Sequence, residues 1–331
     1  MQKDGQELLV AEGLRKSYGP RRALQGLTFS LRAGRILGFL GPNGAGKTTS
    51  IRILTTMLEP DEGRFEVEGI GSEQPEQIRR RIGVLPESLG LPRHMTGLEY
   101  LSYYGQLYGR RSGQARESAQ ALPEDVGLQQ RGRSLIGSYS RGMRQRIGIA
   151  RALVNDPVVV FLDEPTLGLD PRGQQELLEL VKRIARERNA GVILCSHMLS
   201  EIEGICDDVV ILSLGQVVAR GSVAEVIGRV QQNIILGNAL RVQVMADAAA
   251  EARQVLEAMP GIMRVTPVGE MEGWLRLELM GLTDGDLANV HQINNRILAA
   301  LIRARIPILA FEVEGRRLQD VFLRLTEEAI Q

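Results

Sequence analysis

Two short segments of this sequence carry side chains suited to phosphate chemistry. The first is GPNGAGKT at residues 41–48, which follows directly on the apolar run 36–40. A loop of this composition curls so that its backbone N–H groups face a phosphate, and the N-terminus of a following helix adds positive potential. Lys47 is then placed to contact the β- and γ-phosphates of a nucleotide, and the Thr48 hydroxyl to ligate Mg²⁺.

The second segment is VVVFLDEP at residues 158–165. Its apolar run ends at Asp163 and Glu164, at the carboxyl end of a predicted parallel strand, where open α/β sheets bind their ligands. Asp163 can hold Mg²⁺ through water, and Glu164 can polarise an attacking water. An acidic pair at a strand end is a weak signal alone, but downstream of a phosphate loop it predicts nucleotide hydrolysis.

The composition narrows the classes of protein that remain. The chain has 331 residues, 44% of them hydrophobic, which is enough for two domains. Its 40 basic residues balance its 40 acidic residues, which argues against a general attraction to nucleic acid or anionic lipid. Cys195 and Cys206 form no CxxC pair, so they indicate neither a disulfide framework nor a zinc site and fit a reducing cytoplasm. No signal peptide and no apolar run of about eighteen residues is present, so the chain is not expected to cross a membrane.

The elements that must position the phosphate-binding groups follow an α/β pattern. Apolar runs predict strands at 35–40, 158–162 and 191–195, and these alternate with predicted helices at 46–58 and 172–188. Near-continuous apolar strands separated by helices indicate a mostly parallel sheet that is covered on both faces. Further predicted elements are an antiparallel edge from residues 8–10 and 24–31, a helical insertion at 97–122 and a closing hairpin at 209–219.

The pattern of predicted strands and helices changes near residue 236. Beyond it the predicted order is βαββαβ, the ferredoxin-like split arrangement, followed by an amphipathic helix at 318–330. The predicted ranges are strand 240–245, helix 248–259, strands 263–268 and 274–280, helix 290–305 and strand 308–313. The sequence therefore predicts a nucleotide-binding domain over residues 1–235, with a helical subdomain at about 97–155, and a small α+β domain over residues 236–331.

A third segment, SRGMRQ at residues 140–145, resembles the signature motif of the ATP-binding cassette (ABC) family, whose usual form is LSGGQ. The other motifs fall in that family's order. Tyr18 resembles the aromatic residue that stacks on adenine, and Glu87 lies where the family's Q-loop usually has glutamine. Residues 167–170 resemble the D-loop, and His197 resembles the switch histidine that contacts the γ-phosphate. The match spans about residues 7–230 and implies a P-loop ABC nucleotide-binding domain.

In ABC proteins two such domains pair head to tail, and each ATP lies between one domain's phosphate loop and the other's signature. The residues suit this arrangement, because Ser140 and the backbone N–H of Gly142 begin a predicted helix running to Val154, whose dipole would point at a phosphate. One cassette per chain implies that the protein dimerises. The motifs and the resemblance together imply contacts with ATP from Tyr18, Gly41, Pro42, Asn43, Gly44, Ala45, Gly46, Lys47, Thr48, Thr49, Glu87, Ser140, Arg141, Gly142, Met143 and Asp170, ligation of Mg²⁺ by Thr48, Asp163 and Glu87, and catalysis by Glu164 and His197.

Two features depart from the family's usual motifs. Glu87 replaces an amide with a carboxylate, and Arg141 and Met143 replace glycine and glutamine of the signature. Both resemble the subfamily that works with separately encoded permeases for drug, polyketide or lipid-type export. Arg141 is interpreted either as an added cation facing the phosphate or as a dimer-interface residue paired with an acid. Arg144 and Arg146 are expected on the solvated or interdomain side of the helix.

The resemblance implies an ATPase subunit at the cytoplasmic face of the cell membrane, which closes as a dimer around MgATP and drives export through a permease, with no nucleic-acid partner. A soluble ABC ATPase acting on the ribosome or in DNA repair is the alternative. Its classes carry two cassettes in one chain, or coiled-coil or zinc insertions, and this sequence has neither. A regulatory module with a vestigial site is a third hypothesis, which the intact motifs disfavour. The C-terminal domain is regulatory, dimerising, permease-binding or simply structural.

Overall fold

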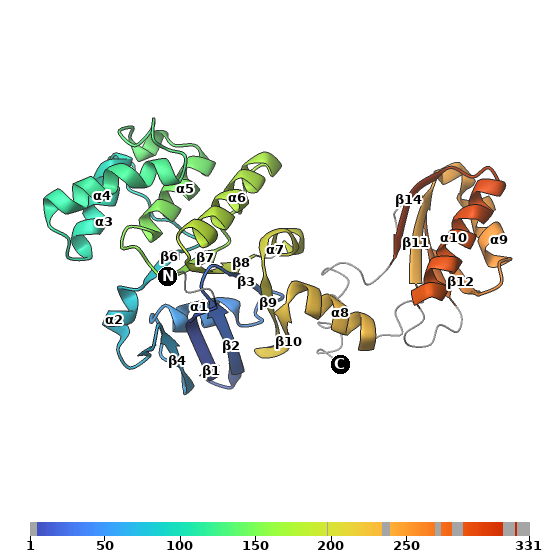
Figure 1. The fold of residues 1–331 in the computed structure, drawn as a ribbon, viewed down its shortest axis with the longest axis horizontal. Helices are drawn as coiled ribbons and strands as arrows, with labels where there is room; N and C mark the ends of the chain where they lie inside the picture. The colour runs from blue at the N-terminus through green and yellow to red at the C-terminus, as the bar shows by residue number, and fades with distance from the viewer. Residues whose placement is uncertain are drawn as a thin grey trace. The chain divides into compact units, whose positions relative to one another are not determined.

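A six-stranded sheet forms the centre of the N-terminal part of the chain (Figure 1). Its strands run, from edge to edge, as β10 (Gln216–Ser222), β9 (Asp208–Ser213), β3 (Ile36–Leu40), β8 (Gly191–Cys195), β7 (Val159–Asp163) and β6 (Ile82–Leu85). All neighbouring pairs are parallel except the β9–β10 hairpin. The computed structural model describes residues 5–196, 198–233, 239–268, 273–279, 287–313 and 322. The predicted parallel sheet and closing hairpin are confirmed.

The inner strands are buried on both faces because they are almost entirely aliphatic or aromatic. Every residue of β3 and β8 is buried, and in β7 only the last residue, Asp163, is partly exposed. Phe39 and Asp163 both lie opposite Cys195 in the parallel register. The residues that follow these three strands therefore emerge together at one edge of the sheet.

A second, antiparallel sheet supplies the predicted edge. It consists of β2 (Arg21–Arg32), β1 (Glu7–Tyr18), β4 (Glu62–Val67) and β5 (Ile70–Gly71), in that order. The helix after the phosphate loop, α1 (Lys47–Leu54), shares one hydrophobic cluster with both sheets through Ile51, Ile53 and Leu54. It was expected to reach residue 58, but it ends early because Thr55 bonds back to the carbonyl of Ile51 and Thr56 takes a left-handed φ of +60°.

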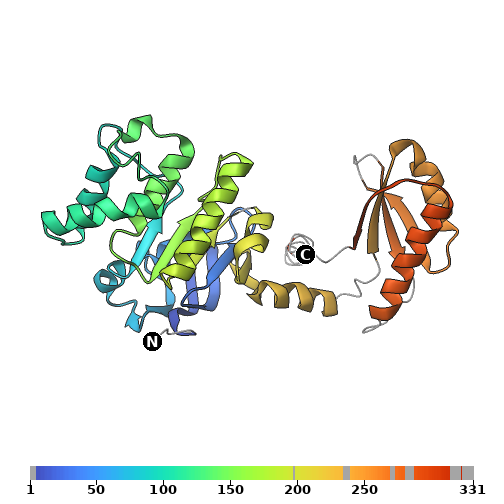
Figure 2. The same ribbon diagram turned by 45° about the horizontal axis from the view of Figure 1, so that its top comes forward.

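The helical insertion consists of two helices, α3 (Gly97–Leu107) and α4 (Ser112–Asp125), and it leads into the signature helix α5 (Arg141–Ala152). Thr96 and Glu99 form a capping box at the start of α3. Gly109, with φ of +87°, lies in the turn that separates α3 from α4. Figure 2 shows these helices as one group beside the central sheet. The remaining elements of the N-terminal part are α2 (Pro75–Arg79), the 3₁₀ turn Ile136–Ser138, α6 (Pro171–Glu187) and α7 (Leu199–Ile205).

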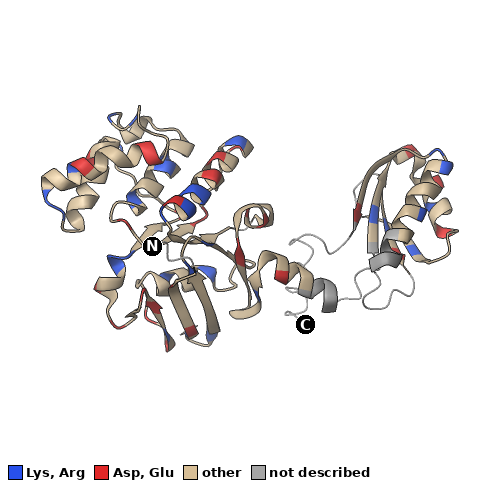
Figure 3. Ribbon diagram, in the orientation of Figure 1, with Lys and Arg blue, Asp and Glu red and all other residues tan. Residues whose placement is uncertain are grey.

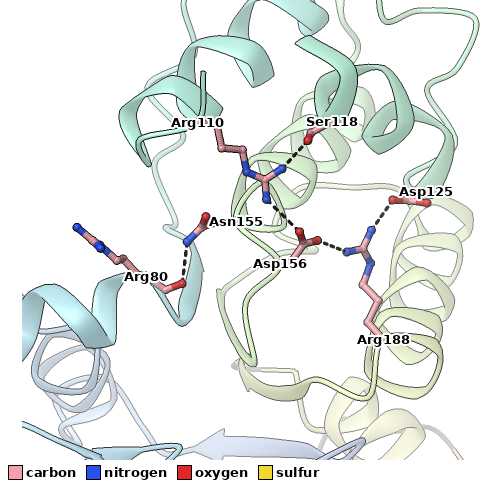
Figure 4. A network of polar contacts seen from close by, with 7 residues as sticks. All are labelled: Arg80, Arg110, Ser118, Asp125, Asn155, Asp156 and Arg188. Carbon is pink, nitrogen blue, oxygen red and sulfur yellow. Dashed lines mark hydrogen bonds and ion pairs between the residues drawn. The ribbon is translucent and has the colours of Figure 1, made fainter. Parts of the chain in front are cut away.

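A chain of polar contacts ties the helical group to the loop before β7 and to the end of α6 (Figure 4). Asp156 accepts from Arg110 at 3.0 Å and from Arg188 at 3.3 Å, and Arg188 also donates to Asp125 at the end of α4 at 2.5 Å. Arg110 donates to Ser118, and Asn155 donates to the carbonyl of Arg80. Asp156 has a left-handed φ of +50°, which an aspartate tolerates better than most residues. Asp156 thus joins the turn between α3 and α4 to the end of α6.

The C-terminal unit has the predicted βαββαβ order. The chain divides into two compact units between Val223 and Ala224, and α8 (Val223–Asn233) begins at that point. The following elements are β11 (Ala239–Val244), the 3₁₀ turn Ala246–Ala248, α9 (Ala249–Glu257), β12 (Ile262–Pro267), β13 (Trp274–Leu279), α10 (Leu287–Arg303) and β14 (Ile308–Val313). The strands pair antiparallel in the order β12-β13-β11-β14. In β13 every second residue is buried, and Leu256 and Leu301 of the two helices share its hydrophobic core, so both helices cover one face.

Two further expectations concern the C-terminal helix and membrane-spanning segments. The helix predicted at 318–330 lies outside the described residues, apart from position 322. Within the described ranges, every helix is too short or too polar to span a bilayer.

The loop network gives a prediction for stability. Arg188→Gln should lower the free energy of unfolding by about 1 kcal/mol and the melting temperature by about 2–4 °C, because two carboxylates lose their shared partner. Arg172→Gln on the same helix is the control, since the Arg172 side chain is 87% exposed and that of Arg188 is 31% exposed. Equal melting temperatures for the two variants, by differential scanning calorimetry, would show that the network is not stabilising.

Candidate nucleotide site

The phosphate loop is shaped by glycines that no other residue can replace without strain. Gly46 caps α1 with φ of +111°, and a Cβ at this position would lie 2.6 Å from the carbonyl oxygen of Ala23. No side chain caps α1 and its first turn carries no acid. The N–H groups of that turn are therefore oriented to bind an anion, and the helix dipole favours one there.

Lys47 points back along the loop that precedes it. Its Nζ donates to the carbonyl of Gly41 at 2.5 Å and to that of Pro42 at 3.3 Å. Ala45 is buried, and its N–H donates to the carbonyl of Pro42 at 3.1 Å. These hydrogen bonds close the loop, and Lys47 is also among the residues that line the adjoining cavity.

A cavity of about 570 Å³ brings the phosphate loop together with the acidic strand end. We call it the phosphate cavity; its lining residues are Tyr18, Arg21, Ala23, Asn43, Gly44, Gly46, Lys47, Thr48, Thr49, Arg52, Glu87, Asp163, Glu164 and Leu167. Tyr18 is 46% exposed at its rim, so its ring is accessible for stacking. The structure thus groups half of the predicted nucleotide contacts, all three predicted Mg²⁺ ligands and the predicted base in one place.

Two charged lining residues were missed by the sequence analysis. Arg21 lies opposite Tyr18 across the β1–β2 hairpin, and its guanidinium is next to Gly44. Arg52 lies in the last turn of α1. The three-residue spacing from Tyr18 across a Gly-Pro turn is a sequence signal that would have indicated Arg21. Arg52 has no such signal, because only the folded position of α1 brings it to the cavity. Both add positive charge to a cavity that must hold a polyphosphate.

The acidic side of the cavity is electrostatically strained. Burial, and after it the negative charges of Glu87 and Glu164, raise the pKa of Asp163 to about 6, against the lowering effect of Lys47 and Arg52. A divalent cation here would relieve this repulsion. The strand neighbour Cys195 is fully buried, and burial raises the pKa of its thiol well above the usual value.

The donor set fits Mg²⁺ better than a softer metal. The side chains at this end of the cavity are a hydroxyl, Thr48, and the carboxylates of Asp163 and Glu87, and hard oxygen donors are the ligands that Mg²⁺ prefers. Among the described residues, no three Asp, Glu, His or Cys side chains come together as a metal cage. Mg²⁺ bound through one or two protein oxygens together with substrate phosphates needs no such cage.

Glu164 has an unusual backbone. Its φ of +49° is left-handed, and its N–H donates to the carbonyl of Cys195 at 2.9 Å. The following turn is closed by the N–H of Leu167 on the carbonyl of Glu164 and by the N–H of Leu169 on the carbonyl of Thr166. A glutamate in this conformation is sterically strained, and such strain persists where the surrounding structure fixes it.

The signature residues line a different cavity, which we call the signature cavity. Its residues include Ser140, Arg141, Gly142 and Met143 from the start of α5, together with Gly168, Leu169 and Asp170. Ser140 caps α5 by accepting from the N–H of Met143 at 3.3 Å, and no acid lies in the first turn. The helix begins as predicted, although it ends at Ala152 and not at Val154.

The other arginines of the signature helix have partners in the same chain. Arg144 donates to the carbonyl of Tyr139 at 2.8 Å. Arg146 donates to the carbonyl of Val126 and forms an ion pair with Glu176 of α6 at 3.0 Å. Figure 3 shows how charges of both signs follow one another along α6. These contacts place Arg146 between α5 and α6, within the N-terminal unit.

Two predicted site residues remain, Asp170 and His197. Asp170, the N-cap of α6, lies in the signature cavity. His197 lies outside the described residues. The neighbouring turn is described: Ser196 is buried, donates to Glu201 at 2.7 Å and accepts from the N–H of Met198 at 3.0 Å.

Comparison with known proteins gives consistent matches. The model of the ABC transporter family matches residues 24–167. Linearmycin resistance ATP-binding protein LnrL of Bacillus subtilis (strain 168) is 32% identical over 326 residues, which cover 98% of this chain and 100% of LnrL. Daunorubicin/doxorubicin resistance ATP-binding protein DrrA of Streptomyces peucetius is 34% identical over 322 residues, which cover 96% of this chain and 92% of DrrA. A solved structure of the ATP binding subunit of an ABC transporter is 31% identical, covers 68% of this chain and 93% of its own, and superposes with a TM-score of 0.60.

The raised pKa of Asp163 gives a prediction for the protein without nucleotide. The folded state holds the proton of this group more tightly than the unfolded state, so its contribution to stability falls as pH rises from about 4 to 6. Asp163→Asn should therefore raise the melting temperature at pH 7.5. The matching gain in unfolding free energy is about 1 kcal/mol once solvent screening is allowed for, and it should be smaller at pH 5.

Asp170→Asn, an exchange between two good N-cap residues, is the matched control in the signature cavity. The two variants are compared with the unmodified protein by calorimetry at both pH values. If Asp163→Asn is no more stabilising at pH 7.5 than at pH 5, the carboxylate repulsion is not a feature of the folded chain.

Proposed function

Because the chain belongs to the ABC transporter family, whose ATP-binding proteins hydrolyse ATP, we propose that it powers export through a separate membrane permease. The working unit is a pair of cassettes that close around two ATP molecules. Its place is the cytoplasmic face of the membrane, held there by the permease. The relatives that match almost the whole chain are named for resistance to linearmycin and to daunorubicin/doxorubicin, which supports an antibiotic-like cargo.

One observation supports the paired arrangement above all. The phosphate loop and the acidic strand end share one cavity, while the signature residues line another. An ATP held by Lys47 therefore takes its signature contacts from a second cassette. Two copies of this chain related by a two-fold axis would provide both sites. The alternative is a heterodimer, in which this chain pairs with a different cassette.

Each residue of the phosphate cavity has a role that fits its position. The ring of Tyr18 stacks on adenine at the rim, and Lys47 with the first turn of α1 neutralises the phosphates. Thr48, Asp163 and Glu87 would hold Mg²⁺, which stabilises the negative charge that develops on the phosphates. Glu164 accepts a proton from the water that attacks the γ-phosphate.

The signature half of the site acts through its helix. Ser140 and the first N–H groups of α5 face the γ-phosphate of the ATP held by the opposite cassette, with the positive end of the helix dipole directed at it. Asp170 and the neighbouring turn lie at the same interface. Closure is thus favoured by the charge of ATP and is lost after the γ-phosphate leaves.

A soluble ABC ATPase acting on the ribosome or in DNA repair is the weaker candidate. The matched relatives with nearly complete coverage are resistance proteins, and this chain carries one cassette. The features that would favour the soluble classes, a second cassette or a long coiled-coil or zinc insertion, do not appear in the sequence.

The role of Glu164 is tested by Glu164→Gln. The amide keeps the size of the side chain but cannot accept the proton, so ATP turnover should fall at least about 100-fold while ATP still binds. The variant should then accumulate as an ATP-bound dimer, detected by size-exclusion chromatography with light scattering. Lys47→Ala is the companion variant and should lose ATP binding and the dimer together. Full turnover in Glu164→Gln would contradict the assignment.

The permease partner is tested by where the chain is found. When it is expressed with a candidate permease of about six membrane spans, the chain should sediment with membranes, and it should remain in the supernatant when the permease is omitted. Sedimentation with ribosomes in either case would contradict the transport function and support the soluble alternative.

A further inference from the structure

Arg141 stands where the usual signature has glycine, and its side chain is used within its own chain. Its Nε donates to the carbonyl oxygen of Leu167 at 2.9 Å. The guanidinium lies directly over Gly168, because a Cβ at that position would be 2.2 Å from the Cζ of Arg141. Gly168, with φ of +70°, thus makes the turn possible and leaves the space that Arg141 occupies.

This hydrogen bond connects the two half-sites of one chain. Arg141 lines the signature cavity, whereas its acceptor, Leu167, lines the phosphate cavity. The N–H of Leu167 in turn donates to the carbonyl of Glu164 at 3.2 Å. A single hydrogen-bonded turn therefore separates the Arg141 contact from the backbone of the residue assigned as the base.

That backbone needs support from both sides. The left-handed conformation of Glu164 is sterically unfavourable, so it is retained only where neighbouring contacts fix it. On the strand side, the carbonyl of Cys195 accepts from its N–H. On the other side lies the turn of residues 164–168, whose carbonyl at Leu167 is held by Arg141.

We propose that Arg141 is a positioning residue for ATP hydrolysis. It fixes the turn of residues 164–168 through the carbonyl of Leu167 and thereby sets the direction of the Glu164 carboxylate. The inference rests on the proposed role of Glu164 as the base. The essential feature is the Nε donor, because the acceptor is a neutral carbonyl. A cation that contacts the partner's nucleotide would depend instead on charge.

Three substitutions separate the donor from the charge. Arg141→Gln places an N–H donor at the same number of bonds from the backbone as Nε, without the charge. Arg141→Met keeps a similar length with neither donor nor charge, and Arg141→Lys keeps the charge but moves the donor one bond further out. Arg141→Gly removes the whole side chain and serves as a second deletion. Because Arg141 is exposed at the start of α5, all four are expected to fold.

The first measurement is steady-state ATP hydrolysis by the full chain. Arg141→Met and Arg141→Gly should lower kcat about five- to tenfold with KM for ATP unchanged, as expected for a lost hydrogen bond that acts only on the chemical step. The kcat of Arg141→Gln should stay within about twofold of that of the unmodified protein, and the kcat of Arg141→Lys should fall between. If Arg141→Lys preserves activity while Arg141→Gln and Arg141→Met both raise KM, Arg141 is a charge on the nucleotide and the proposal is overturned.

The second measurement does not depend on activity. Hydrogen exchange of peptides covering residues 164–170 should be faster in the Met and Gly variants than in the unmodified protein, and unchanged in Gln, without nucleotide. Equal exchange rates of these peptides in Arg141→Met and Arg141→Gln would overturn the proposal. Full turnover in Glu164→Gln would remove the base whatever Arg141 does, whereas an inactive Glu164→Gln with indistinguishable Met and Gln variants would overturn only the positioning role.

Discussion

The parallel register of β3, β8 and β7 is the constraint on which the site depends. Phe39, Cys195 and Asp163 lie in one row across these strands. The phosphate loop therefore begins two residues beyond the row in β3, and Glu164 follows directly on the row in β7. Because side chains alternate between the faces of a sheet, a slip of one residue in β7 would reverse the directions of Asp163 and the apolar residues before it. The buried aliphatic side chains of these strands thus fix the acidic groups opposite the loop.

Sequence reasoning succeeded where one local pattern determines the structure. The apolar runs predicted the central strands to within a residue or two, and the glycines with Lys47 predicted the loop. It failed where tertiary pairing decides. Arg21 reaches the cavity because a hairpin pairs it with Tyr18, and Arg52 does so because α1 rotates it toward the cavity. Neither has a motif of its own. The roles of individual site residues remain predictions, and His197 lies outside the described residues.

The signature helix shows how a neutral protein can keep positive potential at one point. Three arginines lie within six residues there, and Arg141, Arg144 and Arg146 each donate to a backbone carbonyl. A carbonyl satisfies the donor without cancelling its charge. Within the described part of the chain, Arg146 alone of these three also forms an ion pair, with Glu176. The N-terminus of α5 thus retains both its dipole and nearby cations. This favours an anion at a place where no single chain provides the phosphate loop.

The opposing charges of the two half-sites give closure its direction. In the phosphate cavity, the pKa of Asp163 is raised chiefly by burial, and Glu87 and Glu164 add electrostatic repulsion. Mg²⁺ and the phosphates together would relieve it, and the γ-phosphate would then present its remaining negative charge to the signature helix of a second cassette. Loss of the γ-phosphate removes that attraction while leaving the carboxylates in place. The same acidic cluster that makes one chain electrostatically strained therefore makes the pair sensitive to which nucleotide it holds.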